Sequence, residues 1–214
     1  MKTKYHVQIT QRALGNQFSE RALNTIIKAN NWQDRIVNQF SHDEIHFDGS
    51  AFDAGFDYIA GQEQILMEHL QKEEYQQSWQ AFGRIAHSWQ DFFSHSNYVR
   101  LWLNIHGNCP PEEITIDDAD ILTHPKLASG KNYGVIEMIA MLPGISLLVK
   151  PLMPPDSHTH MNLDSPSAGL EFNYTYWAAL KATSAVYENV MVRIHSELKS
   201  ENMAKKFKDL LSTK

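Results

Sequence analysis

The chain has 214 residues, of which 43% are hydrophobic and 21% charged, so it can bury a substantial core and disorder of the whole chain is excluded. Its formal charge of -6 argues against a general nucleic-acid binder that works by neutralising phosphates. The single cysteine, Cys109, excludes a disulfide framework and a metal centre built from cysteines. Eleven histidines are the unusual feature, because histidine is the commonest metal ligand.

Helical periodicity accounts for most of the chain. Apolar residues at three- and four-residue steps predict helices over 7–27, 32–40, 52–70 and 73–106, the last of them ending at Gly107. Pro166 suits the first turn of a further long helix, and a final amphipathic stretch covers 203–211. Seven of the eight prolines fall in 108–165, which is therefore expected to be irregular. We predict an all-α fold in a single domain over 1–214.

Three polar side chains recur at four-residue steps in the most regular of these helices. His87, Asp91 and His95 share one helix face, and the two histidines are about 12 Å apart along the axis. That separation is too large for all three to bind one zinc at bond lengths near 2 Å. The spacing instead suits two or more adjacent metal ions, with Asp91 as a bridge between them. The alternative is an amphipathic helix whose polar stripe happens to be rich in histidine.

Other candidate ligands lie outside this helix. His160 and Asp164 repeat the same spacing just before Pro166, and alone they would more often mark the start of a helix than a metal site. His158 is expected to point elsewhere if this segment is extended. Isolated candidates in the first third of the chain are His6, Asp34 and His46. Each of these, taken singly, is more typical of a cap or a surface position than of a ligand.

The run from Ala86 to Val99 resembles the signature helix of the heterokaryon-incompatibility C proteins, which are in turn similar to the zinc-dependent phospholipases C and the single-strand-specific nucleases. That superfamily is all-α and binds a cluster of zinc ions. The resemblance implies two or three zinc ions in a fold of the phospholipase C type. The ligands it implies, in chain order, are His6, Asp34, His46, His87, Asp91, His95, His160 and Asp164.

The chemistry implied by this resemblance is zinc-dependent hydrolysis of a phosphodiester. Zinc lowers the pKa of bound water toward 7, and Asp34 would double as the general base. The apolar stretch 136–153 would serve as a lid or contact acyl chains, or else be ordinary core and loop. A phospholipid substrate with peripheral membrane contact is favoured over a nucleic acid, and stable nucleic-acid binding is not expected.

The competing hypothesis is a catalytically inactive helical protein, stabilised by metal, with a binding or structural role; a nuclease is the alternative among enzymes. The first residues are polar and no apolar run reaches the roughly 18 residues needed to cross a bilayer. The chain is therefore expected to be cytoplasmic.

Overall fold

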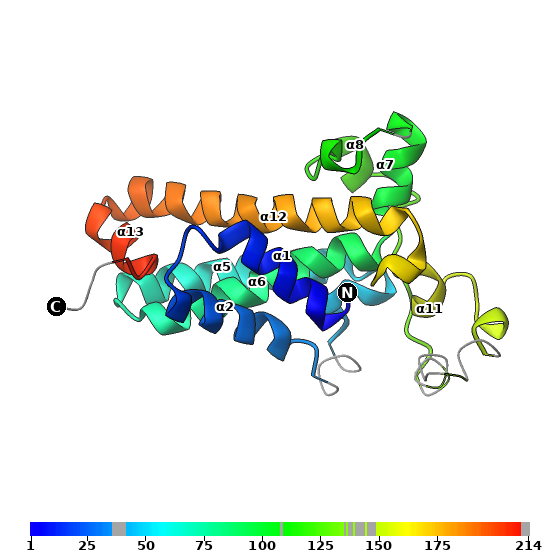
Figure 1. Cartoon of the computed structure of the whole chain (residues 1–214), viewed down its shortest axis with the longest axis horizontal. Helices are drawn as coiled ribbons and strands as arrows, with labels where there is room; N and C mark the ends of the chain where they lie inside the picture. The colour runs from blue at the N-terminus through cyan, green and yellow to red at the C-terminus, as the bar shows by residue number, and fades with distance from the viewer. Residues whose placement is uncertain are drawn as a thin grey trace.

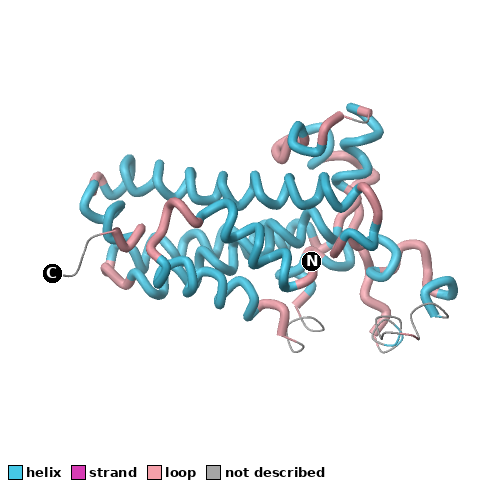
Figure 2. The backbone as a smooth tube through the Cα atoms, viewed as in Figure 1, coloured by secondary structure: helices cyan, strands magenta, loops and turns pink. Residues whose placement is uncertain are grey.

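The computed structural model describes residues 1–35, 42–107, 109–134, 136, 139, 144 and 149–210. Within them the chain is helical with irregular connections, and its only β contacts are isolated bridges, Ser96 with Ser129 and Lys131 with Ser157 (Figure 2). The predicted all-α class is confirmed. The predicted piece at 32–40 and the apolar stretch at 136–153 fall largely outside the described residues.

Helix α6, Tyr75–His95, lies at the centre of the molecule. It packs against α2 (Glu20–Trp32), α5 (Phe52–Gln71) and α12 (Glu171–Arg193), while α1 (Thr3–Leu14) packs on α12 and α2 (Figure 1). The chain closes with α13, Glu201–Phe207, beside the start of α6. At the other end of the bundle lie α7 (Tyr98–His106), α8 (Ala119–Leu122) and α11 (His158–Met161).

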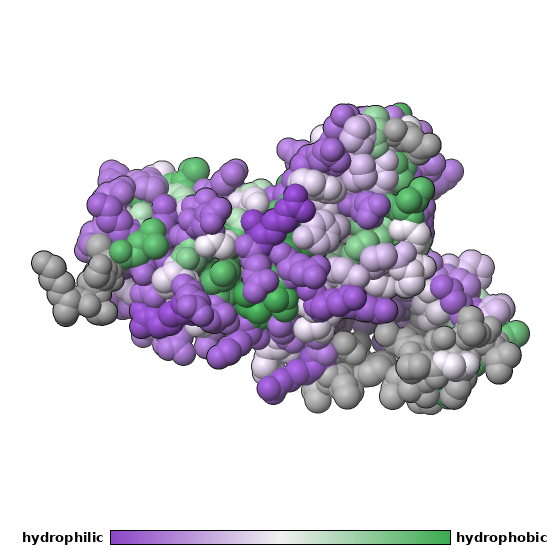
Figure 3. Space-filling model, in the orientation of Figure 1, coloured by the Kyte–Doolittle hydropathy of each residue, from purple (hydrophilic) through white to green (hydrophobic). Residues whose placement is uncertain are grey.

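The main hydrophobic core follows α6. Trp79, Phe82, Ile85, Phe92 and Phe93 are all buried on this helix. Gly83 allows α2 to approach closely, because a Cβ atom at this position would lie 2.3 Å from the carbonyl oxygen of Ile26. The outward face shown in Figure 3 is mainly hydrophilic, with hydrophobic residues in small groups.

Two of the predicted helices are interrupted. The stretch 7–27 divides after Leu14, where α1 ends, and α2 begins at Glu20. Ser19 caps α2, because its hydroxyl accepts a hydrogen bond from the backbone of Ala22. The stretch 73–106 breaks at Ser96, whose extended backbone pairs with Ser129. The side chain of Asn97 holds this break, because it bonds the backbone of Lys126 and Ala128.

Pro166 does not open the long helix, contrary to the prediction. It begins a single 3₁₀ turn, Pro166–Ala168, which ends at Gly169 with φ of 96°, and α12 begins only at Glu171. The elements of 108–165 whose bounds are described are all short: α8, α11 and the 3₁₀ turns Pro111–Glu113 and Lys150–Leu152. The irregular segment expected over 108–165 stays a prediction, because most of 135–148 lies outside the described residues.

No helix among the described residues is both long enough and apolar enough to cross a membrane. Cytoplasmic localisation and peripheral membrane contact stay predictions.

Candidate metal centre

The C-terminal half of α6 carries a row of buried polar side chains. His87 and Asp91 are fully buried and His95 is 4% exposed, so the row faces the protein interior. Other segments supply polar groups opposite it: His6 from α1, Asp34 after α2, and His46 from the short helix α4, Asp43–His46. Further groups come from Asp48, and from His158 and Asp164 at and after α11.

Asp91 is the hub of this cluster. Its Oδ1 lies 3.3 Å from His6 Nε2, 3.6 Å from His95 Nε2 and 2.6 Å from the Met1 nitrogen. Its Oδ2 lies 2.8 Å from His46 Nδ1 and 3.0 Å from His87 Nε2. One carboxylate therefore faces both sides of the cluster, as a bridging ligand would.

A first group of possible ligands consists of His6, Asp34, His87 and Asp91, with one ligand atom of each within 4.8 Å of all the others. The rings of His6 and His87 stack at 4.5 Å. The carboxylate of Asp34 lies 3.8 Å from His87 Nε2 and 4.0 Å from His6 Nε2, and the hydroxyl of Thr3 donates to it. Two imidazoles and two carboxylates are a donor set that suits zinc.

A second group consists of Asp48, His95 and His158, whose ligand atoms meet the same criterion. His95 Nδ1 lies 3.1 Å from Asp48 Oδ1, and His158 Nε2 lies 3.8 Å from the same oxygen. On the other edge of the His95 ring, Nε2 lies 3.4 Å from Asp164 Oδ1. Sequence reasoning missed Asp48, and it set His158 aside.

Of the predicted residues, the structure brings together His6, Asp34, His46, His87, Asp91, His95 and Asp164. It does not bring His160 with them: no described side-chain contact joins His160 to the cluster. Helix α11 ends at Met161 and the backbone is extended at Asn162, so His160 and Asp164 do not share a helix face. His158 lies there instead, with its ring centroid 4.8 Å from that of His95.

Backbone contacts hold the segments of the cluster in place. Leu163 donates to the carbonyl of Ser94, and the Ser94 hydroxyl donates to Asp164. The loop at Gly130 bonds His95 on one side and Gly49 on the other. A side chain at Gly130 would not fit, because its Cβ would lie 2.7 Å from the Cα of His158.

Some buried polar atoms of the cluster lack a hydrogen-bond partner within the described part of the chain. They are His6 Nε2, His46 Nε2 and Asp48 Oδ1. A buried polar group without a partner costs about 1–3 kcal/mol, and three in one cluster point to a ligand that would satisfy them. A cation fits, because lone pairs of imidazole and carboxylate are what these atoms offer.

Charge also favours a cation at this end of the molecule. Although burial raises the pKa of Asp91, the Met1 amine and the surrounding histidines hold it well below its usual value. Burial lowers the pKa of His87 to about 4, so its ring is neutral at neutral pH. The pKa of His95 is raised to about 10, since Asp91 and Asp48 outweigh its burial. The Met1 amine, whose pKa the surrounding carboxylates raise to about 11 despite its burial, lies beside two of them. The carboxylates of the cluster therefore favour positive charge among them.

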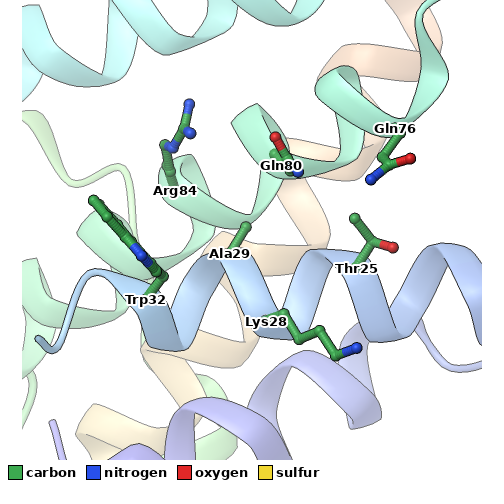
Figure 4. A pocket seen from close by; sticks show the side chains of 7 residues that line it. All are labelled: Thr25, Lys28, Ala29, Trp32, Gln76, Gln80 and Arg84. Carbon is green, nitrogen blue, oxygen red and sulfur yellow. The ribbon is translucent and has the colours of Figure 1, made fainter.

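A separate groove of about 340 Å³ lies between α2 and α6. It is lined by Thr25, Lys28, Ala29, Trp32, Gln76, Gln80 and Arg84, with Trp32 and Arg84 near one end and Thr25 and Gln76 near the other (Figure 4). Two of these side chains are cationic and none is a carboxylate. None of the predicted site residues lines it.

Comparison with known proteins identifies the family. Residues 2–121 match the family model described as the VWA7 N-terminal domain. The chain belongs to this family. Its matched region includes the first group of possible ligands and also His46, Asp48 and His95, whereas His158 and Asp164 lie beyond it.

One curated relative is von Willebrand factor A domain-containing protein 7 of Rattus norvegicus, which is 33% identical over 91 residues. The match covers 41% of this chain and 10% of the relative, so the chain corresponds to a small part of a much longer protein. No solved structure matches the chain.

These findings overturn the family and function predicted from the sequence. The comparisons give no support to the zinc-dependent phospholipase C and nuclease superfamily, so that assignment and the phosphodiester hydrolase drawn from it are wrong. The ligand set was drawn from the same resemblance, but the comparisons do not test it, and the clustered residues stay predicted ligands on the geometry of the two groups.

Proposed function

We propose that this chain is a helical domain with a structural or binding role, whose buried polar end is held together by bound zinc. The observation that carries the proposal is the cluster around Asp91. Histidines and carboxylates from six separate segments converge there, and three of the buried atoms have no hydrogen-bond partner in the described chain. Zinc would convert these unsatisfied groups into bonds that tie the segments together.

The geometry supports two adjacent ions. The first group would hold one ion between α1, the end of α2 and α6, and the second would hold another between α6, Asp48 and α11. The two groups meet where Asp91 of the first lies 3.6 Å from His95 of the second. Each ion would join segments far apart in sequence, which is the role of a structural metal in a domain.

The test is metal content and metal-dependent stability of the same preparation. Protein purified without chelator should carry about two zinc ions per chain by elemental analysis. Removing them should lower the unfolding temperature, and zinc added back should restore it. Zinc at a hundredfold excess over its Kd would contribute about 2.7 kcal/mol.

His6→Ala should lose the zinc of the first group. The matched control is His69→Ala, because the His69 ring bonds Glu74 at a partly exposed site on α5, outside the cluster. Less than one ion per chain, or an unfolding temperature that chelation does not change, would contradict the proposal.

A further inference from the structure

A buried chain of amide and hydroxyl groups connects α12 to the candidate metal centre. At its centre is Gln90 on α6, which is fully buried. The Gln90 Nε2 donates to Thr183 Oγ1 on α12 at 2.9 Å and to Thr10 Oγ1 on α1 at 3.2 Å. The Gln90 Oε1, on the other side of the amide, faces His6 and Asn30.

The donor and acceptor roles in this hydrogen-bond network are determined at Thr183 on α12. Thr183 donates its hydroxyl hydrogen to the carbonyl of Ala179 at 2.8 Å. A hydroxyl has a single hydrogen, so Thr183 Oγ1 can only accept from Gln90. The amide of Gln90 must therefore turn its NH₂ toward Thr183 and its carbonyl oxygen toward His6.

The same logic decides which nitrogen of His6 carries hydrogen. Gln90 Oε1 lies 2.6 Å from His6 Nδ1 and can only accept, so the hydrogen is on Nδ1. In the neutral ring, His6 Nε2 then has a free lone pair. That atom is one of the unpartnered buried atoms and lies 3.3 Å from Asp91 Oδ1.

Asn30 links Gln90 to a second histidine, His87. Its NH₂ donates to Gln90 Oε1 at 3.1 Å, so its carbonyl oxygen faces His87 Nδ1 at 3.3 Å and accepts hydrogen from it. His87 Nε2 is then also free of hydrogen, and it lies 3.0 Å from Asp91 Oδ2. Both rings present the same atom to the first group of ligands.

We propose that Gln90, with Asn30, is a positioning residue that sets the Nδ1–H tautomer of His6 and His87 and so directs both Nε2 atoms at one metal ion. This rests on the proposed metal-binding function. The hydrogen-bond partner of one ring nitrogen determines which tautomer a metal meets, and removing such a partner commonly costs 10–100-fold in metal affinity.

The first measurement needs no variant. Two-bond ¹H–¹⁵N correlation spectra of the histidine rings distinguish the two tautomers, and His6→Ala and His87→Ala identify the two signals. We expect Nδ1–H at both rings in the chelator-treated and in the zinc-loaded protein. Hydrogen on Nε2 of His6 in the folded wild type would overturn the inference.

The variants then test Gln90 itself. Gln90→Met removes the acceptor for His6 Nδ1–H. The His6 ring should then populate both tautomers, and zinc binding should weaken about 10–100-fold. Gln90→Glu keeps an acceptor for His6 and should retain the Nδ1–H signal. The control is Ser88→Ala, since Ser88 is buried on the same helix and its hydroxyl has no hydrogen-bond partner in the described chain.

The outcomes separate this inference from the proposed function. Nδ1–H rings in a protein that binds no zinc would contradict the metal-binding function and leave the tautomer assignment standing. Zinc binding that is unchanged in a folded Gln90→Met, with unchanged ring spectra, would overturn the role of Gln90 alone. If Gln90→Met does not fold, the wild-type spectra still test the tautomer assignment, and Gln90→Glu still tests whether an acceptor at position 90 keeps hydrogen on His6 Nδ1.

Discussion

The two halves of helix α6 are both buried, but they are buried by different means. The first half packs aromatic and aliphatic side chains against the ends of the chain: Phe82 meets Phe18 and Phe207, and the Trp79 indole donates to the Phe207 carbonyl. The second half keeps aromatic residues on one face and turns His87, Asp91 and His95 to the other.

This difference shows which part of the fold is stable without a bound ion. An apolar side chain is stabilised by burial itself, at about 25 cal/mol per Å² removed from water. A buried charge or imidazole is stabilised only if its partners are present. The first half of α6 therefore depends on packing, and the second half depends on what occupies the centre around Asp91.

The largest effect is expected for Asp91→Asn. Removing one member of a buried charge cluster costs about 3–5 kcal/mol, and the amide would also weaken both metal groups, so the zinc-dependent stabilisation should disappear as well. Urea unfolding with zinc and with chelator measures both effects. If the variant keeps normal zinc content and normal stability, Asp91 does not join the two groups of ligands.

Phe82→Ala should cost about 3–5 kcal/mol, from lost burial and the cavity left behind. Because Phe82 lies in the apolar half, the loss should be the same with zinc and with chelator. A loss that depends on zinc would mean that the two halves of α6 are coupled.

Tyr98 belongs to the aromatic face of the second half of α6, because it packs against Phe92 and Phe93. Burial raises its pKa from 10.0 to about 12, so the folded chain keeps this proton between those pH values while the unfolded chain loses it. Stability should therefore fall as the pH rises from about 10 to 12, by up to about 2.7 kcal/mol for this group.

In Tyr98→Phe that part of the pH dependence should vanish, at a cost near neutral pH of about 1 kcal/mol for the lost bond to the Thr115 carbonyl. Unfolding curves of the variant and the wild type at both pH values measure the difference. Parallel pH profiles would show that Tyr98 does not titrate differently on folding.

The smallest effect is expected at the pair of Arg21 and Asp209, which joins α2 to the end of α13 far from the cluster. Arg21 is largely exposed, so Arg21→Ala should lower the unfolding temperature only slightly, and less at high salt. Zinc should not alter this effect. Thermal unfolding at two salt concentrations would detect any larger contribution.

Periodicity could predict the helices because each has one face in the core. It could not locate the breaks at Gly15–Ser19 and Ser96–Asn97, since these depend on partners elsewhere in the chain, such as Ser129 for Ser96. The same limit explains His160. A four-residue step places two side chains on one face only within a continuous helix, and α11 ends before Asp164.

The row of His87, Asp91 and His95 on α6 could be predicted, because in a regular helix residues four positions apart lie on the same face. Asp48 and His158 could not, because they meet this row through tertiary packing alone. Gln90 is on α6 itself, but its role could not be predicted because it depends on contacts with α1, α2 and α12. The family prediction failed for a related reason. It depended on about a dozen residues of one helix and on the order of isolated polar residues, whereas the family match extends over 2–121.

Phe47 adopts a left-handed backbone with φ of 57°, which is uncommon for a residue that is not glycine. It stands between His46 and Asp48, which both face the cluster, while its own ring is fully buried against α5. At Gly55 on α5 a Cβ atom would lie 2.4 Å from that ring. The two positions therefore constrain each other sterically, and we expect homologous chains that carry a side chain at 55 to carry a smaller residue at 47.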